Sequence, residues 1–152
     1  MIRGMSITLA QAIKNAIAAE HSAENFYLRL ANSVTDDKGR RILAEIARQE
    51  RGHAATLEAL ASKLVAGRLP ERADALVQGI ETAPAGNGSE NLELTEALEI
   101  AMDAENSAIL YYEALAATST GEASTFFEQM GKDEEGHATT IRAMLAELGV
   151  EA

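Results

Sequence analysis

Residues 50–57 read Glu-Arg-Gly-His-Ala-Ala-Thr-Leu, and residues 134–141 read Glu-Glu-Gly-His-Ala-Thr-Thr-Ile. The two stretches share a Glu-x-x-His spacing and the Gly, Ala and Thr around it. On an α-helix, residues three positions apart lie on one face, so each Glu and its His can reach the same point. The repeat therefore predicts two equivalent helices that carry the same polar pair.

A second repeat lies upstream of each of these stretches. The pattern Ala-Glu-x-Ser-Ala, followed by Tyr-x-x-Leu-Ala, occurs over residues 19–31 and again over residues 104–116. Both repeats recur in the same order and at nearly the same offset. They predict two helical hairpins related by a pseudo-twofold axis, which would place equivalent side chains on both sides of one site.

Capping and turn signals divide the chain into four long helices. The spacings Thr8 to Gln11 and Ser119 to Glu122 are typical of capping boxes at helix starts, and Gly67 and Gly149 are typical of residues that follow helix ends. The helices are expected over residues 8–34, 38–66, 91–118 and 119–149.

The connections set the order of these helices in space. The first and last connections are short, so each joins antiparallel neighbours. Residues 67–90 contain Pro70 and Pro84 and can cross the length of a bundle, with a short helical turn expected over residues 74–80. The predicted fold is all-α: an up-down-down-up four-helix bundle with one long crossover between helices two and three, as in ferritin-like folds.

Near the middle of each predicted helix, one glutamate interrupts the apolar residues that repeat at heptad spacing along one face. Four carboxylates in one core would repel one another and resist ionisation, so the core needs a compensating positive charge. Two divalent cations would supply that charge, and carboxylate-rich sites with one His per ion suit iron or manganese better than structural zinc. The predicted metal ligands are Glu20, Glu50, His53, Glu105, Glu134 and His137.

Two tyrosines and several small residues near this site each have two possible roles. Tyr27 and Tyr112 are either core aromatics or hydrogen-bond donors to a ligand carboxylate. Small residues on both sides of two of the glutamates either allow close helix packing or leave room for dioxygen, peroxide or water. These small residues are Ala16, Ala23, Ala101 and Ala108. A packing or surface role is expected for His21, and Glu24, Asp103 and Glu135 are expected to be solvated charges.

The composition describes an acidic protein of one domain, residues 1–152. The chain contains no cysteine, and 13 Lys+Arg against 24 Asp+Glu give a formal net charge of −11. The acidic balance argues against nucleic acid as a partner. No run approaches the roughly 18 apolar residues of a membrane span, and the N-terminus lacks a signal-peptide pattern. We therefore expect a cytoplasmic protein with no membrane partner.

The six predicted ligands resemble those of the ferritin-like di-iron carboxylate superfamily, in which two helices give a Glu and two give a Glu-x-x-His. The resemblance implies that Glu50 and Glu134 bridge two ions. It also implies that Glu20 and Glu105 are terminal carboxylates, and that His53 and His137 are terminal imidazoles. Within the superfamily, the Ala-Glu-x-x-Ala motif with a Tyr seven residues after the Glu most resembles the erythrin domain of rubrerythrin.

This resemblance implies an oxidoreductase with two iron ions per chain, with manganese or zinc as alternatives. Rubrerythrins reduce hydrogen peroxide with electrons from a rubredoxin-type iron–cysteine centre. Because the chain has no cysteine, the electron donor is expected to be a separate protein such as a rubredoxin-like partner. The resemblance also implies a homodimer.

Ala108 keeps other functions open. Rubrerythrins carry an extra glutamate at this position, three residues after the third-helix ligand, and the six remaining ligands are those of a bacterioferritin ferroxidase centre. The alternatives are therefore a ferroxidase or iron-storage protein that reacts with dioxygen, a manganese catalase, and a non-catalytic scaffold stabilised by its metals.

Overall fold

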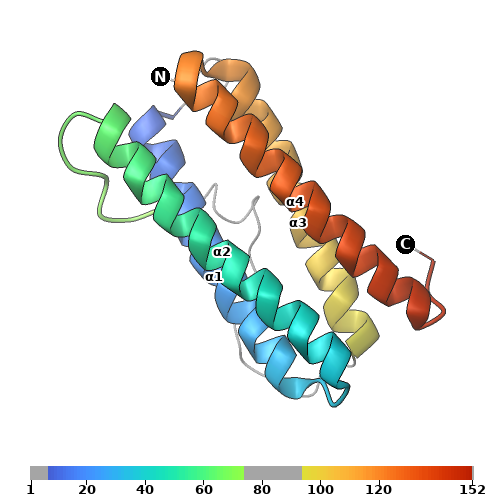
Figure 1. The fold of residues 1–152 in the computed structure, drawn as a ribbon. Coiled ribbons are helices and arrows are strands. Elements are labelled where there is room, and N and C mark those ends of the chain that lie inside the picture. The colour runs from blue at the N-terminus through green and yellow to red at the C-terminus, as the bar shows by residue number, and fades with distance from the viewer. Residues whose placement is uncertain (1–6, 74–93, 152) are drawn as a thin grey trace.

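The computed structural model describes residues 7–73 and 94–151 of the chain, and this part is an antiparallel bundle of helices (Figure 1). The helices are α1 (Leu9–Ser33), α2 (Asp37–Leu64), α3 (Leu94–Thr118) and α4 (Gly121–Glu147). Within the described ranges there is no β-strand. The helices α1 and α2 form one hairpin and α3 and α4 form the other, with α2 and α3 running in the same direction (Figure 1). The predicted all-α, up-down-down-up bundle is confirmed.

Side-chain caps begin the two helices of the first hairpin. The Oγ1 atom of Thr8 accepts a hydrogen bond from the backbone N–H of Gln11 at 3.1 Å, as the capping-box spacing predicts. The Asp36 carboxylate accepts from the backbone N–H of Gly39 at 2.7 Å. Each cap satisfies a helix N–H that has no partner within the helix.

The predicted Ser119 cap of the fourth helix is wrong. The N-cap of α4 is Thr120, which makes no side-chain capping bond. Ser119 still belongs to the end of α3, because its N–H donates to the carbonyl of Leu115 at 2.9 Å. Gly121 then adopts a φ of +61°, a left-handed conformation that favours glycine and lets the chain reverse sharply.

The other helix ends lie close to their predicted positions. The helix α2 stops at Leu64, two residues before the expected end, and Gly67 has a φ of +89° just beyond it. The predicted start of the third helix at residues 89–91 and the predicted helical turn at 74–80 lie outside the described residues. Most of the predicted crossover over residues 67–90 lies outside them as well.

The apolar core has two halves, one toward each end of the bundle. One cluster includes Ile13, Leu57 and Phe127, and the other includes Leu43 and Ile141, all fully buried. Fully burying side chains of this size stabilises the fold by about 1.5–3 kcal/mol each. The glutamates predicted as ligands lie between the two halves, and their side chains are buried. Among the described helices, none combines the length and the apolar character needed to span a bilayer.

Candidate metal centre

The middle of every helix contributes one buried glutamate to the core. The side chains of Glu20, Glu50, Glu105 and Glu134 are at most 1% exposed. Each occupies a position that continues the apolar face of its helix, so helix packing alone brings it inside. His53 and His137 follow one turn after Glu50 and Glu134 and are also buried, at 9% and 4% exposed.

These six residues form two overlapping groups. In each group the candidate ligand atoms all lie within 4.8 Å of one another. The first group is Glu20, Glu50, His53 and Glu134, and the second is Glu50, Glu105, Glu134 and His137. Glu50 and Glu134 belong to both groups, so they stand between the two. The structure therefore brings together all six of the predicted ligands.

The inner nitrogen of each histidine faces the carboxylates. His53 Nδ1 lies 3.0 Å from Glu134 Oε1 and 3.2 Å from Glu50 Oε2. His137 Nδ1 lies 2.8 Å from Glu50 Oε1 and 3.5 Å from Glu134 Oε2. The two imidazole rings stack with centroids 5.7 Å apart. Each ring thus reaches both of the shared glutamates.

Several of these buried atoms lack hydrogen-bond partners within the described part of the chain. They are Glu20 Oε2, Glu50 Oε1, Glu105 Oε2, both carboxylate oxygens of Glu134, and His137 Nδ1. The 2.8 Å contact between His137 Nδ1 and Glu50 Oε1 is close, but it does not have the alignment of a hydrogen bond. Buried polar atoms without partners are costly, at about 1–3 kcal/mol each. A set of convergent oxygen and imidazole donors fits divalent cations, which would pair with all of them.

Without a bound cation, protons balance the charge of this cluster. Burial, together with the charges of Glu50 and Glu134, raises the pKa of both Glu20 and Glu105 well above the usual carboxyl range. Burial would also raise the pKa of Glu50 and Glu134, but contacts with the two histidines outweigh it and lower the pKa of both groups.

The histidines respond in the opposite direction. Burial would lower their pKa values, but Glu134 and Glu50 outweigh it at both rings, with Glu20 adding to the effect at His53. The result is a pKa for His137 of about 11 and an even higher pKa for His53. The cluster thus favours protons on both imidazole rings and disfavours the charged forms of Glu20 and Glu105.

Each terminal glutamate accepts a hydrogen bond from a tyrosine of the opposite hairpin. Tyr112 on α3 donates to Glu20 Oε1 at 2.5 Å, and Tyr27 on α1 donates to Glu105 Oε1. Of the two readings of these tyrosines, the structure therefore shows the hydrogen bond to a cluster carboxylate. In both cases the bond engages Oε1, while Oε2 has no hydrogen-bond partner. Glu20 Oε2 lies 3.4 Å from His53 Nδ1, whereas Glu105 approaches His137 Nδ1 through Oε1, at 3.7 Å.

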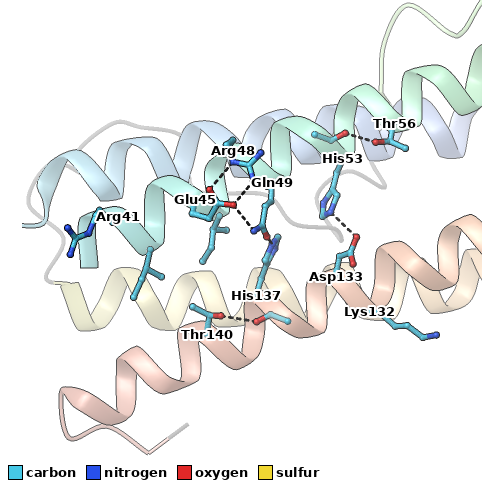
Figure 2. A pocket seen from close by; sticks show the side chains of 14 residues that line it. Arg41, Glu45, Arg48, Gln49, His53, Thr56, Lys132, Asp133, His137 and Thr140 are labelled. Atoms are coloured by element: carbon cyan, nitrogen blue, oxygen red, sulfur yellow. Dashed lines mark hydrogen bonds and ion pairs between the residues drawn. The ribbon is translucent and has the colours of Figure 1, made fainter. Parts of the chain in front are cut away.

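Two further residues, which the sequence reasoning missed, hold the outer nitrogens of the histidines. His53 Nε2 lies 3.3 Å from Asp133 Oδ2, and His137 Nε2 lies 2.7 Å from Gln49 Oε1 (Figure 2). Gln49 and Asp133 each directly precede a shared glutamate. A hydrogen-bond acceptor at this same place in both Glu-x-x-His stretches is the signal that could have identified them.

The prediction for Glu24 is wrong. This carboxylate is 8% exposed rather than solvated, because Arg51 of α2 covers it with an Nε–Oε1 contact of 2.6 Å. His21, Asp103 and Glu135 are exposed, as expected. The four small residues beside the glutamates are at most 1% exposed; these residues are Ala16, Ala23, Ala101 and Ala108.

A groove of about 890 Å³ between α2 and α4 leads from the surface to both histidines (Figure 2). Three basic side chains line it: Arg41, Arg48 and Lys132. Small molecules entering this groove would meet the imidazole side of the cluster first.

A four-helix bundle with a buried cluster of carboxylates and imidazoles at its centre is the architecture of ferritin-like metal proteins. The rubrerythrin family model matches residues 11–145, most of the chain, and the chain belongs to the rubrerythrin family. The family and the buried cluster together indicate a metal-binding centre.

Two solved structures share this fold across nearly their full lengths. A hypothetical protein from Pyrococcus furiosus is 25% identical, with a TM-score of 0.80 over 99% of this chain and 98% of that one. An uncharacterised conserved protein from Magnetospirillum magnetotacticum is 23% identical, with a TM-score of 0.74 over 93% of this chain and 95% of that one. A search of curated protein sequences finds no match.

Proposed function

We propose that the protein is a di-iron oxidoreductase that reduces hydrogen peroxide as part of the defence against oxidative stress. The observation that carries the proposal is the pair of overlapping four-residue groups, which share Glu50 and Glu134 and contain buried atoms without partners. Two groups with shared carboxylates suit two ions held side by side rather than a single ion.

In this proposal Glu50 and Glu134 bridge the two ions. Glu20 and His53 complete the shell of one ion, and Glu105 and His137 complete the shell of the other. Iron is the proposed metal, with manganese and zinc as competitors for the same donors. When bound, two ferrous ions would supply the two electrons that, with two protons, convert one peroxide to two waters.

The protein's own groups orient the ligands and limit access. Tyr27 and Tyr112 each engage one oxygen of a terminal carboxylate and leave the other for an ion. Gln49 accepts a hydrogen bond from Nε2 of His137, and the Asp133 carboxylate forms an ion pair with Nε2 of His53, so both leave Nδ1 for the cluster. The apolar halves of the core keep water from the other sides, so the groove between α2 and α4 is the proposed entry for peroxide.

The proposal also includes partners. The chain contains no cysteine, so a separate protein, such as a rubredoxin-like carrier, would return the electrons. We further propose a homodimer in the cytoplasm. Light scattering would test the dimer, and electron transfer from reduced rubredoxin would test the donor.

A ferroxidase is the second candidate, and Ala108 favours it. This residue lies one turn after Glu105 and is fully buried, so the ligand set has no further carboxylate at that position. A ferroxidase would use dioxygen to oxidise ferrous ions as substrate and pass them into a large oligomeric cage.

Stopped-flow kinetics of the Fe(II)-loaded protein would separate these functions. The proposed peroxidase predicts that peroxide oxidises the bound iron much faster than dioxygen does, with about one peroxide consumed per two ferrous ions. Faster oxidation by dioxygen, with uptake of further iron, would instead favour the ferroxidase. Iron that stays bound but inert to both oxidants would show a structural metal scaffold.

A further inference from the structure

The two histidines are held from outside by different kinds of acceptor. His53 on α2 meets the carboxylate of Asp133 on α4, and His137 on α4 meets the amide oxygen of Gln49 on α2 (Figure 2). Gln49 and Asp133 occupy equivalent places in the repeat, since each precedes a shared glutamate. The pseudo-twofold arrangement thus keeps the position of the acceptor but changes its charge.

A hydrogen bond fixes which end of the Gln49 amide faces the histidine. Its Nε2 donates to Glu45 Oε1 at 3.0 Å, and Arg48 pairs with the same carboxylate through an Nε–Oε2 contact of 2.8 Å. The amide oxygen of Gln49 is therefore the atom that accepts from His137. The Glu45 carboxylate thus contacts the amide rather than the ring, and the Arg48 guanidinium compensates its charge.

The second hairpin holds the same two groups in reverse order. Gln129 Nε2 donates to Asp133 Oδ1 at 2.9 Å, and the other oxygen of Asp133 faces His53. Here the carboxylate touches the ring directly, and the amide stands behind it. In the first arrangement the Glu45 carboxylate bonds the Gln49 amide, which bonds the His137 ring. In the second arrangement the Gln129 amide bonds the Asp133 carboxylate, which contacts the His53 ring.

This difference acts on the ligand strength of the two rings. Once an ion displaces the proton from Nδ1, the Gln49 hydrogen bond and the Asp133 ion pair both favour the remaining ring proton on Nε2, so Nδ1 is the ligand atom. A carboxylate partner makes the imidazole a stronger ligand than a neutral amide does, and replacing such outer partners typically changes metal affinity by about 10–100-fold. His53 should therefore bind an ion more strongly than His137.

We propose that Asp133 and Gln49 are positioning residues that make the two metal positions unequal, so that the position served by His53 fills first. The inference rests on the proposed metal centre. It adds an order of filling that the pseudo-symmetric ligands alone would not produce.

The test is a titration of the full chain with Zn²⁺, which binds the same donors and is not oxidised. The chain has three histidines, and the exposed His21 serves as a reference outside the site. With ¹⁵N-labelled histidine, the Nδ1 signals of His53 and His137 report each position separately, once assigned from variants that lack one histidine. In the wild type, the His53 signal should shift with the first equivalent of Zn²⁺ and the His137 signal with the second.

Isosteric variants provide the matched controls. The double variant Gln49→Glu/Asp133→Asn keeps the net charge and should reverse the order, so that His137 shifts first. Asp133→Asn alone should weaken binding of the first ion by about tenfold or more. Glu99→Gln, which removes the charge of an exposed carboxylate on α3, should leave both affinities unchanged.

The outcomes separate this inference from the metal centre beneath it. If both histidine signals shift together in the wild type, or if the order of shifts is unchanged in the double variant, the two metal positions are not made unequal by Asp133 and Gln49. Either result would leave the proposed metal centre itself intact. No shift of either ring and no retained Zn²⁺ would overturn the metal centre itself.

Discussion

The hydroxyl of Tyr27 on α1 donates a hydrogen bond to Oε1 of Glu105 on α3, which ties one hairpin to the other at the centre of the bundle. Its pseudo-symmetric mate, Tyr112 to Glu20, makes the same bond in the opposite direction. Each bond restricts the rotation of a carboxylate that belongs to the buried cluster and leaves its Oε2 without a hydrogen-bond partner. The two hairpins are thus joined through the same side chains that are proposed to bind metal.

Removing the Tyr27 hydroxyl should weaken metal binding at the Glu105 position. In Tyr27→Phe the carboxylate loses its fixed orientation, so the affinity for one of the two ions should fall by about tenfold. Competition with a chromophoric chelator would measure both affinities. Tyr111→Phe is the control, because it removes another buried interhelical hydrogen bond, from Tyr111 to the carbonyl of Ala12, without touching the cluster. Equal losses in the two variants would contradict an orienting role for Tyr27.

The shared and terminal glutamates should differ in their effect on metal content. Glu50→Ala removes a side chain that belongs to both groups, so the variant should retain almost no metal. Glu20→Ala removes a member of one group and should weaken one ion more than the other. Metal analysis after desalting measures both effects. Tight retention of two ions by Glu50→Ala would show that the assignment of bridging and terminal roles is wrong.

Metal binding should become stronger as the pH rises. The raised pKa values of His53, His137, Glu20 and Glu105 mean that these groups bind protons more tightly than usual when no cation is bound. A cation must displace those protons, so lowering the proton concentration favours binding. Calorimetry in buffers of different ionisation enthalpy counts the protons, and the structure predicts a net release of protons when two ions bind. An affinity that does not change with pH would contradict these proton positions.

Metal should also stabilise the fold, because both hairpins contribute ligands. A ligand that binds only the native state adds about 2.7 kcal/mol to the free energy of unfolding at a concentration 100 times its Kd. Urea unfolding with and without Zn²⁺ should show this increase in the wild type. In Glu50→Ala the added Zn²⁺ should leave the unfolding midpoint unchanged. An equal gain in the variant would place the stabilising metal elsewhere.

Helical periodicity is the reason the six cluster residues were predictable from sequence. On each helix, one glutamate occupies a position where the apolar face requires a core residue; these are Glu20, Glu50, Glu105 and Glu134. Four helices can pack their apolar faces together in only a few ways. The fold followed from the same pattern together with the unequal lengths of the connections.

Contacts across helices were harder to predict, since they depend on how one helix is rotated against another. Gln49 and Asp133 each reach a histidine on the facing helix, and Arg51 covers Glu24 from α2. The Ser119 cap was wrongly predicted because the backbone N–H of Ser119 bonds back to Leu115 at the end of α3, so that the N-cap of α4 is Thr120.

The most direct test of the account is the iron content of the protein after incubation with excess Fe(II) in air and desalting. A centre with two overlapping ligand groups predicts about two iron ions per chain, and about none in Glu50→Ala. Tens of ions per chain would show iron storage. Near-zero retention by the wild type would contradict the central claim that this cluster is a di-iron site.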